Sequence, residues 1–206
     1  MISAEQALER LREGNQRFVS GTRGREAEQN HSRRAELVNK QSPFAIILGC
    51  SDSRVPAEMV FDQGIGDLFV IRVAGNIVAP SQVGSIEFAA DRFGTPLVVV
   101  MGHTQCGAIL ASLEQLERPT ESGSPNLGFI VKNIQPNVEP LLKTPLTSDR
   151  EALVASAVRA NIMASAEQLR HGSEILESLI REKGLLVVGA EYSLETGVVD
   201  FFDGVP

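Results

Sequence analysis

Four short apolar runs limit the fold of this 206-residue chain more than any other feature. They are rich in β-branched residues, and within each run the apolar residues are continuous rather than alternating. This pattern is typical of strands that are covered on both faces in a parallel sheet. Segments with helical spacing separate the runs, so the sequence predicts an α/β fold with a central, mainly parallel β-sheet flanked by helices. The predicted strands are 44–49, 68–73, 96–102 and 185–190.

The segments outside these strands complete the predicted architecture. Residues 4–18 have the spacing of an amphipathic helix, which packs either on its own sheet or on a second subunit. The stretch TGVVDFFDG at 196–204 predicts a C-terminal edge strand. We expect a single domain over residues 1–206, with an N-terminal helical arm at 1–40 and an α/β core at 41–206. Further helices are expected at 35–39, 56–61, 82–93, 105–116 and 151–182, with a break at Gly172, and a proline-kinked helix is expected within 117–149.

The composition argues against several classes of partner. The formal net charge is -7, whereas nucleic acid or an anionic membrane would favour clustered Lys and Arg. The only dense basic stretch, Arg23 to Arg34, is interrupted by Glu26 and Glu28 and is predicted to be a solvated loop. No window approaches the roughly 18 to 20 apolar residues of a membrane span, and the first residues lack the apolar segment of a secretory signal. We therefore expect a soluble, cytoplasmic protein that binds neither nucleic acid nor membrane.

Two of the predicted strands end in residues that can bind a metal. Cys50 follows the first strand, and His103 and Cys106 follow the third, in a chain with two cysteines and three histidines. Because the carboxyl ends of parallel strands open into one crevice, these side chains should meet. Two thiolates and one imidazole suit Zn²⁺ and leave the fourth tetrahedral position open, as in catalytic rather than structural zinc sites. Taken alone, Cys50 is equally well explained as a small buried filler.

Two charged residues lie close to the first of these cysteines. Asp52 and Arg54 stand two and four positions beyond Cys50. Near a strand end they could form a structural ion pair, and beside a zinc ion they could instead set the state of its water. The joint pattern of these residues is far more specific than any part of it.

The motifs CSDSR at 50–54 and GHTQCG at 102–107 resemble the signature of the β-class carbonic anhydrases, C-x-D-x-R with H-x-x-C. The resemblance extends over nearly the whole chain. LREGNQRFVSG at 11–21 is similar to the family's N-terminal helical arm, and IRVAGNIV at 71–78 is similar to its next strand and loop. The stretch VVGAEYSLETGVVDFF at 187–202 is similar to the family's ending.

This resemblance implies a reaction and a role for each residue. Cys50, His103 and Cys106 would hold one Zn²⁺ per chain, which lowers the pKa of bound water towards about 7 and yields the hydroxide that hydrates carbon dioxide to bicarbonate and a proton. Asp52 and Arg54 would form the catalytic dyad that controls the fourth zinc position. Asp52 accepts a hydrogen bond from the zinc-bound oxygen while Arg54 holds the carboxylate off the metal. If Arg54 released it, Asp52 would become the fourth ligand and close the site.

The resemblance also implies a substrate pocket and an assembly. In the open, plant-like subclass a Gln, a Phe and a Tyr line the pocket, and this chain has Gln41, Phe69 and Phe88 at those positions. Gly107, next to the second cysteine, is assigned to the same pocket. Some of these groups reach in from a neighbouring subunit, so we expect a homo-oligomer, either a dimer or a dimer-based tetramer.

A second subclass of the family is closed at lower pH and is stabilised in that state by bicarbonate, through a Trp, an Arg and a Tyr. Here Ile47 stands where the Trp would be, while Arg72 matches the Arg and Tyr192 is the counterpart of the Tyr. The closed-state set of residues is therefore incomplete in this chain.

Three alternatives to a carbonic anhydrase remain open from the residues. The same zinc hydroxide could hydrolyse a related heterocumulene, such as carbon disulfide or carbonyl sulfide. A non-catalytic zinc-binding sensor would keep Asp52 locked on the metal. A thiol redox protein or a cysteine nucleophile would need a resolving cysteine nearby or a separate histidine partner. Whether Asp52 sits with Arg54 or on the metal is the observation that separates the sensor from the enzyme.

Overall fold

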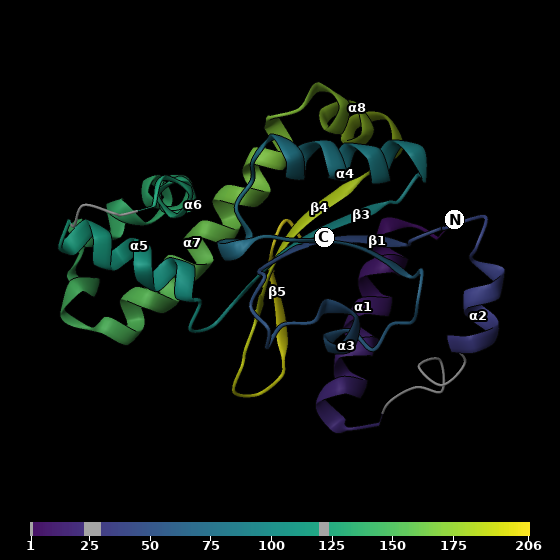
Figure 1. Cartoon of the computed structure of the whole chain (residues 1–206), viewed down its shortest axis with the longest axis horizontal. Coiled ribbons are helices and arrows are strands. Elements are labelled where there is room, and N and C mark those ends of the chain that lie inside the picture. Colours follow the sequence, from purple (N-terminus) through teal and green to yellow (C-terminus); the bar gives the residue numbers. More distant parts are fainter. Residues whose placement is uncertain (1, 23–29, 120–123) are drawn as a thin grey trace.

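The computed structural model of the chain describes residues 2–22, 30–119 and 124–206. Its centre is a five-stranded sheet in the order β2-β1-β3-β4-β5 (Figure 1). All neighbouring strands are parallel except the β4–β5 pair. The predicted α/β fold with a mainly parallel sheet is confirmed, and the predicted C-terminal strand lies at an edge. The strands are β1 (Ala45–Gly49), β2 (Leu68–Arg72), β3 (Leu97–His103), β4 (Leu186–Tyr192) and β5 (Val199–Asp203).

Helices cover both faces of this sheet (Figure 1). They are α1 (Ala4–Ser20), α2 (Asn30–Glu36), α3 (Ala57–Val60), α4 (Pro80–Arg92), α5 (Gly107–Glu117), α6 (Pro125–Val138), α7 (Arg150–His171) and α8 (Glu174–Lys183). One face of the sheet, including Ile46 and Val98, packs against α4 to α8, and the other face, including Ile47 and Val99, packs against α1 and α3. This double cover explains why the strand sequences are continuously apolar. No described helix is both long enough and apolar enough to cross a membrane.

One helical segment differs from the prediction. The second helix is Asn30–Glu36 rather than 35–39, so residues 30–34 of the basic stretch are helical and the predicted loop is wrong there. An ion pair contributes to this placement, because the Arg33 guanidinium lies 3.4 Å from the Asp67 carboxylate just before β2. Residues 23–29 of the basic stretch lie outside the described residues. The proline-kinked helix is α6, which contains Pro136 and is followed by 3₁₀ turns at Glu139–Lys143 and Pro145–Ser148.

Other boundaries agree with the sequence pattern. The break predicted at Gly172 is confirmed, because α7 ends at His171 and α8 begins at Glu174. The Ser3–Gln6 capping box at the start of α1 is present. The division of the chain into an arm at 1–40 and a core at 41–206 stays a prediction.

Helix α1 packs against its own sheet. Leu8 and Leu11 are fully buried in the layer that also contains β1 and β3. Gly14 allows a close approach to the segment after α3, since a Cβ atom there would lie only 1.9 Å from the Phe61 carbonyl oxygen. The amphipathic face predicted for this helix therefore has a partner within the chain.

A buried amide then ties α1 to the far end of the sequence. Asn15 Nδ2 donates to the carbonyl oxygens of Val60 at 3.1 Å and Gly197 at 2.9 Å, and its Oδ1 accepts from the Val199 N–H at 2.9 Å. The side chain joins the first helix, the turn after α3 and the start of β5. It also satisfies backbone groups that would otherwise be buried without partners.

We predict that Asn15→Ala lowers the free energy of unfolding by about 3 kcal/mol, because two carbonyls and one N–H lose their partner in a buried place. Urea denaturation followed by circular dichroism measures this loss. The neighbouring Gln16 is exposed, so Gln16→Ala should stay within about 0.5 kcal/mol of wild type. Equal effects of the two substitutions would show that the Asn15 bonds do not stabilise the fold.

Candidate metal centre

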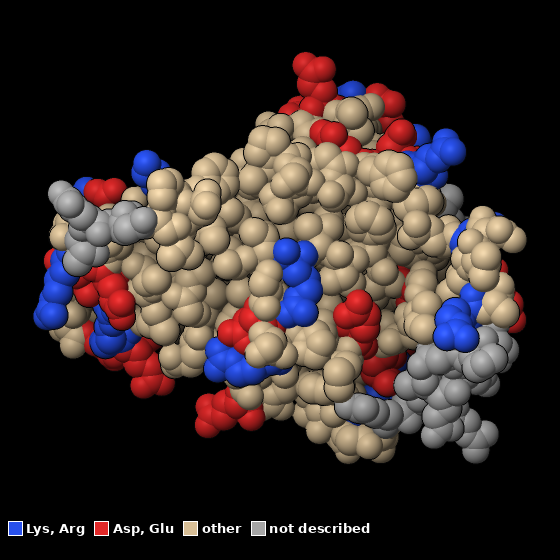
Figure 2. Space-filling view, in the orientation of Figure 1, with Lys and Arg blue, Asp and Glu red and all other residues tan. Residues whose placement is uncertain are grey.

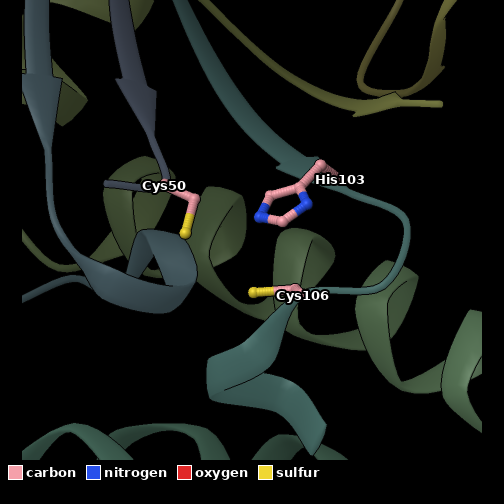
Figure 3. Close-up of side chains that lie close together, drawn as sticks. All are labelled: Cys50, His103 and Cys106. Atoms are coloured by element: carbon pink, nitrogen blue, oxygen red, sulfur yellow. The ribbon is translucent and has the colours of Figure 1, made fainter. Parts of the chain in front are cut away.

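Cys50, His103 and Cys106 meet at the carboxyl ends of β1 and β3 (Figure 3). Cys50 directly follows β1, His103 ends β3, and Cys106 is the N-cap of α5. The parallel register, with Gly49 opposite Met101, places the two strand ends side by side. One ligand atom from each of the three side chains lies within 4.8 Å of the others, and all three residues are buried. The predicted ligand set is therefore brought together by the fold.

The imidazole of His103 is oriented for binding a metal. Its Nδ1 lies 2.9 Å from the backbone oxygen of Thr104, which can only accept a hydrogen bond, so Nδ1 carries the hydrogen. Nε2 then presents its lone pair, and it is buried with no hydrogen-bond partner among the described residues. A buried polar atom without a partner is costly, and a metal ion held with the two sulfurs would satisfy it. This donor set suits zinc.

The two thiols shift each other's pKa in opposite directions. The hydrogen bond from Cys106 lowers the pKa of Cys50 to about 4, against the opposing effect of burial. The same bond, together with burial, raises the pKa of Cys106. Burial opposes a charge on His103, but the Cys50 thiolate outweighs it and raises the pKa of His103. A divalent cation among the three groups would favour both thiolates and the neutral imidazole.

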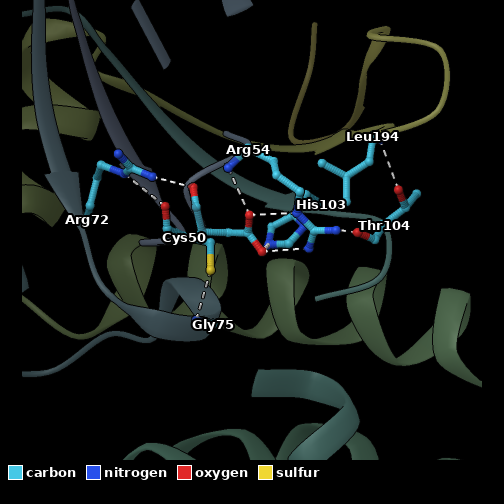
Figure 4. A network of polar contacts seen from close by, with 8 residues as sticks. Cys50, Arg54, Arg72, Gly75, His103, Thr104 and Leu194 are labelled. Atoms are coloured by element: carbon cyan, nitrogen blue, oxygen red, sulfur yellow. Dashed lines mark hydrogen bonds and ion pairs between the residues drawn. The ribbon is translucent and has the colours of Figure 1, made fainter. Parts of the chain in front are cut away.

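Asp52 and Arg54 form an ion pair beside these ligands (Figure 4). Arg54 Nε donates to Asp52 Oδ1 at 2.9 Å and Nη2 donates to Oδ2 at 2.7 Å, while the Arg54 backbone N–H also donates to Oδ1 at 2.9 Å. The Arg54 hydrogen bonds hold the pKa of Asp52 well below its usual range. Asp52 Oδ2 also lies 3.8 Å from His103 Nε2. The carboxylate thus faces the metal-binding atoms while the guanidinium restrains it.

Arg72 fixes the loop that carries the first ligand. Its Nε donates to the Cys50 carbonyl oxygen at 3.0 Å, and its Nη2 donates to the Asp52 carbonyl oxygen (Figure 4). Tyr192 lies opposite His103 in the β3–β4 register, and both Tyr192 and Ile47 are buried. The three positions that correspond to the closed subclass therefore support the sheet and the ligand loop here.

The predicted pocket residues fall into two groups. Gly107 begins α5 directly after Cys106, and a Cβ atom added there would meet nothing within 4 Å, so the glycine borders open space. Gln41 precedes β1, whereas Cys50 follows it, and a five-residue strand is about 17 Å long. Phe69 on β2 and Phe88 on α4 both pack around Phe93, with ring centroids 6.3 and 5.3 Å from it. Within one chain, the fold does not bring Gln41, Phe69 and Phe88 to the three ligands.

Two residues that hold the ligands were missed by sequence reasoning. The Thr104 carbonyl orients His103, and Thr104 is itself anchored through its hydroxyl, which accepts from the Leu194 N–H at 3.0 Å (Figure 4). Gly75 donates its N–H to Cys50 Sγ at 3.4 Å. The position of Thr104 next to a ligand could have indicated its role. Nothing in the sequence indicates that Gly75, 25 positions beyond Cys50, returns to contact it.

The fold and the site together define an α/β protein with a Cys₂His cluster that could hold a metal ion at the carboxyl edge of its parallel sheet. A family model described as carbonic anhydrase matches residues 45–199. The chain belongs to the carbonic anhydrase family, in its β-class, and is thus a carbonate dehydratase, as its motifs predict.

The chain is similar to known carbonic anhydrases over most of their length. The chain is 37% identical over 193 residues to carbonic anhydrase 2 of Mycobacterium tuberculosis, covering 93% of this chain and 89% of that protein. It is 36% identical over 197 residues to a carbonic anhydrase of Mycolicibacterium smegmatis, covering 94% and 91%. Among solved structures, the β-carbonic anhydrase CafA of Aspergillus fumigatus matches with a TM-score of 0.76 and 26% identity, covering 93% of this chain and 88% of that one. A tetrameric β-carbonic anhydrase from Sordaria macrospora shares the fold, with a TM-score of 0.73 and 23% identity over 96% of this chain and 98% of that one.

We predict that the purified protein contains about one zinc ion per chain and that His103→Ala loses most of it, because two thiolates alone leave the tetrahedral set incomplete. Elemental analysis measures the zinc. His171 provides the matched control, since it is exposed on α7 and pairs with Glu167 at 3.2 Å, and His171→Ala should keep its zinc. A wild-type protein that folds and is active without zinc would contradict the assignment.

Proposed function

We propose that the chain binds one zinc ion through Cys50, His103 and Cys106 and catalyses the reversible hydration of carbon dioxide to bicarbonate and a proton. The observation that carries this proposal is the buried Nε2 of His103, which has no hydrogen-bond partner among the described residues and lies within 4.8 Å of both sulfurs. Zinc bound there would supply Lewis-acid chemistry, which makes water a nucleophile near neutral pH. Family membership supports the same reaction.

Asp52 and Arg54 are proposed to position the attacking water. The Asp52 carboxylate is ionised and can only accept hydrogen bonds, so its Oδ2 would orient one O–H of the water and leave a lone pair directed at carbon dioxide. Arg54 makes a bidentate contact with both oxygens of Asp52, which fixes the carboxylate and keeps it from joining the ligand set. Both residues are thus proposed as catalytic, with Asp52 in contact with the reacting water.

The ion pair between Asp52 and Arg54 also bears on the alternatives to this function. A sensor that keeps Asp52 on the metal is disfavoured, because the carboxylate is paired with Arg54. A thiol redox role gains a second cysteine near Cys50, but both cysteines are buried, which limits attack on an external substrate. Carbonyl sulfide and carbon disulfide would use the same ligand set, so they belong in the same assays as carbon dioxide.

We predict that Asp52→Asn keeps its zinc but lowers kcat/KM for carbon dioxide hydration about 100-fold, because the amide keeps the shape of the side chain and loses the acceptor charge. Stopped-flow assays with a pH indicator measure this loss. Asp200→Asn is the control, since Asp200 lies on β5, apart from the ligand set, and pairs with Arg159 at a distance of 2.8 Å. Near-normal activity of Asp52→Asn would remove Asp52 from the mechanism, and a zinc-loaded wild type that does not hydrate carbon dioxide would overturn the proposed function.

We also propose a homo-oligomer in which a second subunit completes the pocket. Gln41, Phe69 and Phe88 do not reach the ligands of their own chain, while Phe88 is 54% exposed although it is a large apolar residue. β2 is an edge strand of the sheet. In the view of Figure 2, uncharged side chains cover a continuous area from α5 and α6 across to α4. A surface with few charged residues is typical of an interface core, and the tetrameric relative from Sordaria macrospora supports a dimer or a dimer-based tetramer.

We predict that Phe88→Lys weakens self-association more than about 100-fold and reduces activity with it, because the substitution buries an unpaired charge in the interface. Analytical ultracentrifugation and the hydration assay measure the two effects. Met163 on α7 is similarly exposed, at 48%, and Met163→Lys should leave both unchanged. A wild type that is monomeric and fully active would contradict the shared pocket.

We propose that the protein is located in the cytoplasm. The two cysteines are free and buried rather than joined in a disulfide, which suits a reducing compartment. Carbon dioxide and bicarbonate are the proposed small-molecule partners, and the acidic net charge of -7 gives no reason to expect nucleic acid or a membrane surface.

A further inference from the structure

A short turn packs against the first ligand from inside the protein. The turn is the 3₁₀ segment Ala74–Asn76, and the Gly75 N–H in it donates to Cys50 Sγ at 3.4 Å in a buried place (Figure 4). A hydrogen bond to a sulfur favours its charged form and withdraws electron density from it. The geometry of this turn therefore affects how strongly Cys50 donates to a metal.

The turn has an unusual backbone. Gly75 has φ 69° and ψ 20°, and the next residue, Asn76, has φ 43°, so two successive residues are left-handed. A Cβ atom at Gly75 would lie 2.7 Å from Ile134 Cδ1 and 3.0 Å from Ala108 Cβ, so α5 and α6 close tightly around it. Glycine adopts this conformation freely, whereas a left-handed non-glycine residue such as Asn76 is held by its surroundings, so contacts from outside the turn help to fix its peptide planes.

Asn161 on α7 makes that contact. Its Nδ2 donates to the Gly75 carbonyl oxygen at 2.8 Å, and its Oδ1 accepts from Asn137 Nδ2 at 3.0 Å. The side chain is 1% exposed, and both ends of its amide are hydrogen-bonded. Asn137 in turn donates to the Asn133 carbonyl oxygen at 3.3 Å within α6. A hydrogen-bonded chain thus runs from α6 through α7 to the glycine that contacts the thiol.

We propose that Asn161 is a positioning residue of the metal centre, which acts through Gly75 to set the orientation and donor strength of the Cys50 sulfur. Asn137 fixes the amide of Asn161 so that its N–H group faces the turn. Neither asparagine is a ligand in the Cys50, His103 and Cys106 set. This inference rests on the proposed zinc site and extends it to residues that are distant from Cys50 in the sequence.

The chain contains a matched control for this role. Ser165 lies one turn further along α7, is 3% exposed, and donates its hydroxyl to the Asn76 carbonyl oxygen at 3.2 Å. Asn161 and Ser165 therefore make the same kind of buried bond from the same helix to consecutive carbonyls. Asn161 holds Gly75, which contacts the Cys50 thiol, whereas Ser165 holds Asn76, the next residue along the chain. If Asn161 only anchored the turn to α7, substitutions of Asn161 and of Ser165 should have equal effects on metal binding.

The test uses the full-length protein loaded with Co²⁺ and, separately, with Zn²⁺. Asn161→Ala should raise the Zn²⁺ dissociation constant, measured against a competing chelator, about 10-fold to 100-fold, because the Cys50 sulfur is no longer held in its ligand orientation. Its sulfur-to-cobalt charge-transfer band should move to longer wavelength, because a sulfur that loses its hydrogen bond is more easily oxidised. Asn137→Ala should move both quantities in the same direction by less. Ser165→Ala should keep the band in place and stay within about twofold of the wild-type dissociation constant.

Three outcomes would overturn the proposal: an unchanged band and dissociation constant in Asn161→Ala, equal changes in Asn161→Ala and Ser165→Ala, or a wild type that binds neither metal. If Asn161→Ala does not fold, Asn137→Ala decides, and an unchanged band in that variant overturns the proposal. A wild type that binds Co²⁺ and Zn²⁺ but hydrates no carbon dioxide would overturn the proposed reaction alone. In that case the band shift still decides the role of Asn161.

Discussion

The parallel pairing of β1 with β3 is the contact on which the rest of the site depends. It places Gly49 opposite Met101, so the chain leaves the two strands at neighbouring points and delivers Cys50 and His103 to one place. Both strands are buried throughout, and a slip of one residue would move every side chain into the close packing of the opposite face, so the packing fixes their register. Cys106 follows at the N-cap of α5. The precision of the donor set therefore comes from the hydrophobic core.

The ion pair between Asp52 and Arg54 contributes geometry more than stability. The Arg54 side chain is 55% exposed, so solvent screens the ion pair and it adds little to the stability of the fold. Their bidentate bonds nevertheless leave the carboxylate little rotational freedom, and Arg72 fixes the loop backbone on the other side. A weak interaction can thus hold a side chain in one position when the core already supplies the stability.

The sequence alone predicted the features whose residue types and spacing are compatible with only a few structures. The continuous apolar runs predicted the parallel strands, and the scarcity of Cys and His predicted the ligand cluster at their ends. The beginning of α2 was misplaced because tertiary contacts such as Arg33 with Asp67 carry no local pattern. The same reason hid Gly75 and Asn161, whose hydrogen bonds span 25 and 86 positions along the chain. Gln41, Phe69 and Phe88 stay predictions as pocket residues, because the structure of a single chain does not test a pocket shared between subunits.

The depth of the three ligands has a kinetic consequence. Cys50 is 5% exposed, Cys106 is 1% exposed and His103 is fully buried. Chelators would therefore have little direct contact with the donor atoms, and we expect an ion held there to enter or leave when the loops after β1 and β3 open. The rate of metal exchange would then be limited by that opening rather than by the strength of the bonds to the ion. Chelation kinetics would report how often the carboxyl edge of the sheet comes apart.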